Sequence, residues 1–82
     1  MTTAAQLNYI AERLGTEATQ EDAAQVAAMA SAIAEEQGDD GFELIDWLNN
    51  RTYEWTDLWE AANGNTAALL KVRTEAGLAA LS

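Results

Sequence analysis

The stretch DDGFELIDWLNNRTYEWTDLWEAA, residues 39–62, holds all three tryptophans, the only phenylalanine and seven of the fourteen carboxylates of the chain. Its apolar side chains are large enough to fill the core of a small protein, whereas its carboxylates must face water or a cationic partner. We therefore expect an aromatic core and an acidic face within one segment. The apolar set is Phe42, Leu44, Ile45, Trp47, Leu48, Trp55, Leu58 and Trp59.

The carboxylates of this segment recur every three residues, at 40, 43 and 46 and again at 54, 57 and 60. On a helix each such step rises about 4.5 Å and rotates by about 60°, so the acids form a band along the helix surface. We predict that this band contacts a partner. Its members are Asp39, Asp40, Glu43, Asp46, Glu54, Asp57 and Glu60.

Two helices are expected before this segment. Thr3 begins a Thr-x-x-Gln pattern typical of a capping box, which predicts a helix over residues 4–14 that ends at Gly15. Thr19 and Asp22 form a second, weaker pattern of the same kind. It opens a long Ala-rich helix that runs to Gln37 and is closed by Gly38, with small residues on one side for close helix packing.

Three shorter helices are expected after this long helix. Asp40 and Glu43 resemble a cap for a helix that holds Leu44 to Leu48, and Thr52 is a candidate cap for a helix that holds Trp55 to Ala62. Asn63 and Gly64 favour a left-handed end for that helix, because the flanking residues lack the alternation of a hairpin. Asn65 then caps a final helix through Ala76, which Leu78 and Leu81 could extend. The predicted fold is all-α, a small single-domain bundle of four to five short helices over residues 1–82.

Composition excludes several chemistries. The chain has no cysteine and no histidine, which removes disulfides, thiol nucleophiles, the usual zinc sites and imidazole catalysis. A calcium loop fails on its ligand spacing; a weak cation site at Asp39, Asp40 and Glu43 competes with their roles as caps and solvated acids, which we prefer. We therefore predict a non-enzyme without catalytic residues, metal ligands or a cofactor. Neither a signal peptide nor a membrane-spanning stretch is evident, and we expect a soluble, cytoplasmic protein.

The net charge of −10 narrows the class of partner. Four cations among 82 residues argue against direct binding to nucleic acid or to an anionic membrane, since both need Lys and Arg to displace counterions. The competing interpretation is that the acids only keep an Ala-rich protein soluble.

Two functions remain. In the first, the acids occupy a Lys/Arg-lined groove built for nucleic acid, so that the protein acts as a nucleic-acid mimic that inhibits or regulates a basic partner protein. In size, acidity and lack of catalytic residues, the chain resembles the small phage-encoded inhibitors of host defence nucleases, including anti-CRISPR proteins. This resemblance implies an inhibitor of a nucleic-acid-binding protein.

In the second function the acids are solvated and an aromatic surface binds. Tryptophan and tyrosine are enriched at interface hot spots, and the candidate surface is built from Tyr53, Trp55 and Trp59, or from Trp47. The result would be a helical adaptor or a homodimer. The alternative for each tryptophan is burial in the core. Salt separates the two functions, because mimicry weakens steeply with ionic strength and aromatic docking does not.

Overall fold

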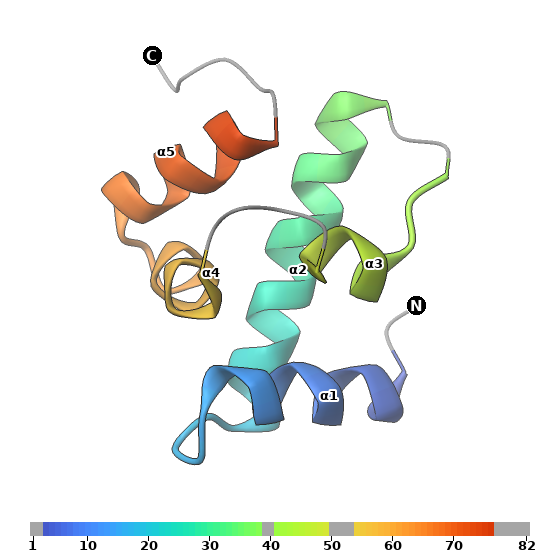
Figure 1. Cartoon of the computed structure of the whole chain (residues 1–82), viewed down its shortest axis with the longest axis vertical. Helices are drawn as coiled ribbons and strands as arrows, with labels where there is room; N and C mark the ends of the chain where they lie inside the picture. The colour runs from blue at the N-terminus through green and yellow to red at the C-terminus, as the bar shows by residue number, and fades with distance from the viewer. Residues whose placement is uncertain (1–2, 39–40, 50–53, 77–82) are drawn as a thin grey trace.

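The computed structural model describes residues 3–38, 41–49 and 54–76, and these residues form five α-helices with short connections (Figure 1). No strand occurs in these three ranges, so the predicted all-α fold is confirmed. In order, the helices are α1 (Ala4–Leu14), α2 (Gln20–Gln37), α3 (Leu44–Asn49), α4 (Trp55–Ala62) and α5 (Thr66–Glu75).

The first two helices begin and end where their local sequence predicts. The Thr3 hydroxyl accepts from the Gln6 N–H at 3.2 Å, and the Gln6 side-chain oxygen accepts from the Thr3 N–H at 2.9 Å. Thr19 and Asp22 make the same reciprocal pair at the start of α2, at 3.2 and 2.9 Å. At the end of α2, Gly38 adopts a left-handed conformation with φ of 67°, which a residue with a Cβ enters at a cost.

The starts of α3 and α4 differ from the prediction. Glu43, rather than Asp40, precedes the first turn of α3: its carbonyl accepts from the Trp47 N–H and its carboxylate from the Asp46 N–H, both at 2.9 Å. The predicted cap of α4 at Thr52 is wrong, because Glu54 is the N-cap. The Asp57 carboxylate reaches back to the Glu54 N–H at 3.1 Å, which sets the helix start two residues later than expected.

The connection between α4 and α5 follows the sequence pattern. Asn63 is the C-cap of α4, and Gly64 turns the chain with φ of 96°. The Asn65 side chain then accepts from the Ala68 N–H at 3.1 Å, as predicted for the cap of α5. The suggested extension of this helix through Leu78 and Leu81 lies outside the described residues.

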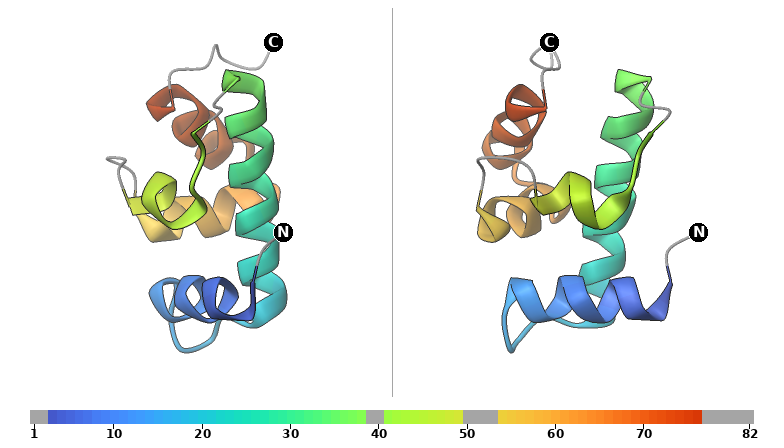
Figure 2. Two further views of the ribbon diagram at one scale, coloured as in Figure 1. Left: turned by 90° about the vertical axis from the view of Figure 1, so that its right-hand side faces the viewer. Right: turned by 45° about the vertical axis from the view of Figure 1, so that its right-hand side comes forward.

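Helix α2 is the central helix of the fold. It runs the length of the molecule, α1 crosses its first turns, and α1, α3, α4 and α5 all lie on one side of it (Figures 1 and 2). The covered side carries the small residues that the sequence predicted for close packing, and Ala23, Ala27 and Ala30 are buried there. The residues with the largest fully buried side chains are Ile10, Val26, Leu58 and Val72.

The five helices therefore meet in one hydrophobic cluster. Full burial of an aliphatic side chain of this size contributes about 1.5–3 kcal/mol relative to exposure. No polar or charged residue in the described ranges is buried, which leaves the carboxylates at the surface. Within the same ranges, none of the helices combines the length and apolar character needed to cross a membrane.

Candidate protein-binding surface

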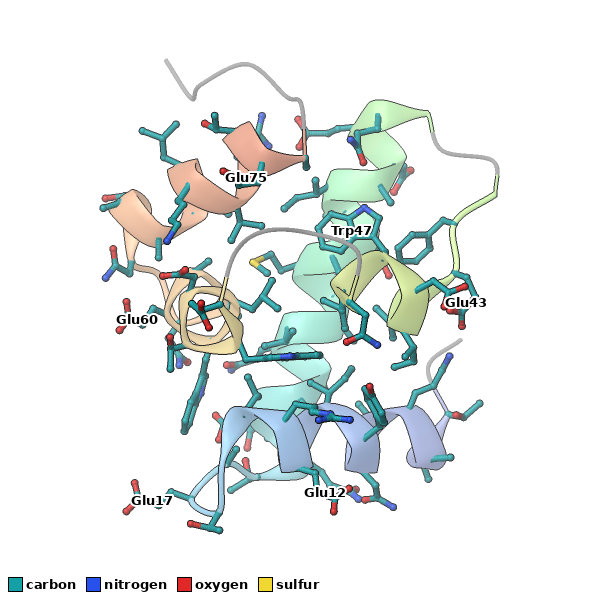
Figure 3. All side chains as sticks on the ribbon, viewed as in Figure 1. Glu12, Glu17, Glu43, Trp47, Glu60 and Glu75 are labelled. Carbon is teal, nitrogen blue, oxygen red and sulfur yellow. The ribbon has the colours of Figure 1, made fainter. Side chains whose placement is uncertain are left out.

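The acids predicted to contact a partner lie on two helices, as the sequence pattern indicated. Glu43 and Asp46 belong to the start of α3, whereas Glu54, Asp57 and Glu60 belong to α4. Glu43 and Glu60 lie at opposite edges of the molecule in Figure 3. The acids of α3 and those of α4 therefore do not form one continuous row that a flat partner surface could contact. Asp39, Asp40 and Tyr53, also predicted as contacts, lie outside the described residues.

Several of these acids serve the fold. The Glu43 carboxylate caps α3, and the Asp57 carboxylate accepts from Lys71 Nζ at 2.8 Å as well as from the Glu54 N–H. The hydrogen bond from Lys71, followed by the one from the Glu54 backbone, lowers the pKa of Asp57 below its ordinary value. Asp57 thus joins the start of α4 to α5. Asp46 and Glu60 are exposed, and their side chains have no hydrogen-bond or ion-pair partner within the described ranges.

Trp47 is a core residue. Only 5% of its surface is exposed, and its ring meets Phe42 edge to face with 6.4 Å between centroids. Its indole N–H points to the Gln37 side-chain oxygen at 3.4 Å, and the Gln37 amide in turn donates to the Ala76 carbonyl. Trp47 therefore packs α3 against the end of α2. Because it is buried, its predicted place on an aromatic binding surface is wrong.

The other two tryptophans are half-buried against the same core. The Trp59 indole N–H is buried and makes no hydrogen bond of good geometry within the described residues. The pKa of the nearby Asp22 is lowered mainly by the Thr19 backbone N–H and least by this indole. Trp55 meets the ring of Tyr9 edge to face, with 6.4 Å between centroids. Neither tryptophan presents a fully exposed ring to a partner.

Tyr9 was not singled out from the sequence, yet it connects three helices. Besides Trp55 on α4, it contacts Asn49 of α3, whose side-chain amide donates to the tyrosine oxygen at 3.1 Å. The Arg13 guanidinium lies 5.0 Å from the centre of the Tyr9 ring. Its position four residues before Arg13 was the available signal, because residues so spaced share one face of a helix.

Each cation that the structure describes is used within the chain. Lys71 pairs with Asp57, Arg73 pairs with Glu36, and Arg13 lies over Tyr9. The hydrogen bond to Asp57, together with the charge of that carboxylate, raises the pKa of Lys71 above its ordinary value. The remaining exposed carboxylates consequently have few counter-charges on the protein itself.

A hollow of about 360 Å³ lies at the corner between α1 and α2. Gly15 turns the chain there with φ of 134°, a conformation that favours glycine. Glu12 and Glu17 stand on the two sides of this turn (Figure 3), and Glu21 follows in the first turn of α2. We call residues 8–22 the α1–α2 corner. The hollow is lined by Asn8, Ala11, Glu12, Gly15, Thr16 and Ala18.

The sequence pattern predicted a site in residues 39–62 and gave no indication of the α1–α2 corner. Its acids are not regularly spaced, and Tyr9 is the one aromatic residue in the corner, so the pattern that marked the later segment is absent. The available signal was a carboxylate in the last turn of a helix, where it opposes the helix dipole.

Metal binding receives no support from the described side chains, since no three acidic groups among them come together as ligands. Comparison of the chain with protein-family models, with curated protein sequences and with solved structures finds no match.

Proposed function

We propose that this protein is a non-enzymatic binding protein that inhibits or regulates a partner through a basic surface, in the manner of a nucleic-acid mimic. The observation that supports the proposal is that the carboxylates are mostly exposed, whereas the described cations are engaged within the chain. Exposed carboxylates occur on every helix or at its start, while the described cations are engaged internally. The described ranges therefore present a strongly negative surface to solvent, within a chain of net charge −10.

Such a surface favours a cationic partner for physical reasons. Two opposite charges 4 Å apart attract by about 1 kcal/mol in bulk water and by about 4 kcal/mol near a protein surface. Summed over many acids, the field also raises the association rate with a basic groove by about 10–10³-fold. A second copy of this chain would carry the same −10 and be repelled, so a homodimer is the less favourable partner.

Binding by mimicry would work without one ordered row of acids. Because the predicted band is divided between α3 and α4, the partner would contact carboxylates from more than one helix, as a groove that wraps the protein could. The resemblance in size and acidity to phage-encoded inhibitors of defence nucleases, including anti-CRISPR proteins, supports the same class of partner, a nucleic-acid-binding protein.

The test is competition. A basic protein captured from host lysate at low salt would be purified, and its binding to a fluorescent nucleic acid measured with increasing amounts of this chain. We expect stoichiometric displacement of the nucleic acid, weakened at least about tenfold between 50 and 300 mM salt, as charge-driven association requires.

The test variant carries Glu35→Gln, Asp46→Asn and Glu60→Gln, which remove three exposed charges and no cap or ion pair within the described ranges. This variant should compete less well while circular dichroism remains unchanged. Binding without displacement, or displacement insensitive to salt, would contradict mimicry. Salt-insensitive binding that is lost in Trp55→Ala would instead favour the adaptor alternative with its aromatic interface.

A further inference from the structure

We propose that the hollow at the α1–α2 corner is an arginine-binding site, in which Glu12 pairs with a guanidinium group of the partner. This inference rests on the proposed function, because it names the side chain of a basic partner that the acidic protein selects. The hollow, of about 360 Å³, is large enough for one such side chain.

The lining matches the two parts of an arginine side chain. Ala11 and Ala18 provide apolar walls for the aliphatic stem, while the carboxylate of Glu12 and the oxygens of Asn8 and Thr16 are acceptors. A guanidinium carries five N–H donors and is more weakly hydrated than an ammonium, so it gains more from several acceptors around one hollow.

The charge at this corner favours a cation. Glu12 lies in the last turn of α1, where the partial negative charge of the helix end adds to that of the carboxylate. It is exposed and has no ion-pair partner within the described ranges. Folding alone gives no reason for an acid at this position, whereas a bound cation does.

Asn8 is held in place before any ligand binds. Its side-chain oxygen accepts from the Gln20 side-chain amide, which ties the wall of the hollow to the first residue of α2. Thr19 and Asp22 fix the same end of α2 through their capping box. The corner is therefore preorganised on both sides, which lowers the entropy cost of binding.

A neighbouring hollow shares Glu12 with the proposed site. It has a volume of about 250 Å³ and is lined by Tyr9, Glu12 and Arg13. Here the guanidinium of Arg13 already lies over the Tyr9 ring. Glu12 lines both hollows and forms no ion pair with Arg13 in the described part of the chain, so its carboxylate is open to a partner.

The experiment is a titration of the ¹⁵N-labelled protein with N-acetyl-arginine amide, followed by NMR. N-acetyl-citrulline amide is the matched control probe, because it has nearly the same shape without the charge. We expect the arginine probe to shift the backbone signals of Gly15, Thr16 and Ala18, with the citrulline probe causing much smaller shifts at equal concentration.

Two charge variants locate the effect. Glu12→Gln should lower the affinity for the arginine probe by about fivefold, the loss expected for one solvent-exposed charge contact of about 1 kcal/mol. Glu35→Gln, which removes the same charge from the other end of α2, should leave the affinity unchanged. The proposed site would be wrong if both variants lowered the affinity equally. It would also be wrong if the arginine probe shifted the backbone signals near all the acidic residues to the same extent.

A third variant keeps the charge and fills the space. Ala18→Met should abolish the shifts at Gly15 and Thr16 while circular dichroism stays helical; retained binding in this folded variant would overturn the pocket. If the arginine probe fails while salt-sensitive competition for the partner persists, this inference is wrong and the proposed function stands. If competition also fails, both are wrong.

Discussion

The acids of α3 and α4 differ from those of the α1–α2 corner in what they contact. On α3 and α4, Glu43 caps a helix and Asp57 joins α4 to α5 through Lys71. At the corner, Glu12, Glu17 and Glu21 are exposed and have no ion-pair partner in the described part of the chain. Among the regularly spaced acids, Glu43 and Asp57 stabilise the fold while Asp46 and Glu60 stay exposed; of the acids at the corner only Asp22 caps a helix, and the three glutamates remain available to a partner.

The reason lies in helix geometry. A carboxylate three residues from a helix start reaches the free N–H groups of the first turn, so a spacing of three is what caps require. The same spacing looks like a charged band when only the sequence is considered. An acid in the last turn, such as Glu12, has no such N–H group to bind and is left for solvent or a ligand.

The largest expected effect concerns α3. Trp47→Ala should lower the free energy of unfolding by about 3–5 kcal/mol, because it removes a large side chain that is 5% exposed. Urea denaturation followed by circular dichroism measures the loss. The half-buried Trp55 is the comparison, and Trp55→Ala should cost clearly less. A loss below about 1 kcal/mol for Trp47→Ala would contradict its place in the core.

The next effect lies at the corner. Thr19→Ala removes the hydroxyl that accepts from the Asp22 N–H, and should lower the free energy of unfolding by about 1 kcal/mol. Thr16→Ala is the matched control, since Thr16 lines the hollow and caps no helix; its effect should stay within about 0.5 kcal/mol. If the two variants were equally stable, the capping box would not hold this end of α2.

Low pH should destabilise the fold both at the α1–α2 corner and at the start of α4. The Thr19 backbone N–H is the largest cause that lowers the pKa of Asp22 below 3.8, and Lys71 does the same for Asp57. A carboxyl whose pKa is lower in the folded state stabilises the fold above its unfolded pKa of about 3.9, and this contribution is lost as the pH falls through the folded pKa.

We therefore expect Asp22→Asn and Asp57→Asn to melt below the wild type at pH 7, with the difference shrinking as the pH falls below about 4. Melting curves from pH 7 to pH 2.5 measure this convergence. Glu60→Gln, which removes an exposed charge without a hydrogen-bond partner in the described ranges, is the control and should show no such convergence. Differences that stay constant with pH would mean that the two carboxylates stabilise nothing through their charge.

The smallest effect is expected for the acids left available at the corner. Glu12→Gln and Glu17→Gln should each change the free energy of unfolding by at most about 0.5 kcal/mol, and Glu12→Gln should stabilise slightly because it relieves the opposition to the helix dipole. Chemical denaturation at low salt gives the most sensitive comparison. A loss above about 1 kcal/mol would place these acids among the structural ones and remove the contrast between the two regions.

Local patterns predicted much of the fold correctly. The ends of α1 and α2 follow from Thr3, Gly15, Thr19 and Gly38, because a cap depends on hydrogen bonds between residues three or four apart. The starts of α3 and α4 were misplaced because more than one polar residue near each start can act as a cap. Which one does so depends on where the helix must sit to bury Leu44, Trp47 and Leu58.

The candidate site was less predictable. Trp47 could be assigned to the core or to the surface on equal grounds, since its burial is set by Gln37 and the end of α5 rather than by its neighbours in sequence. The hollow at the corner requires the angle at which α1 crosses α2, which no residue spacing specifies (Figure 1).

The sequence by itself determined the helical fold, most of the caps and the charge of −10, because periodicity, capping and composition act over a few residues or over the whole chain at once. Only the tertiary structure decided which charges are engaged. Asp57 meets Lys71 across 14 positions, Glu36 meets Arg73 across 37, and Tyr9 meets Asn49 across 40. Contacts at such separations exist only after the helices pack, because burial of their apolar faces, and not local hydrogen bonding, brings these side chains together.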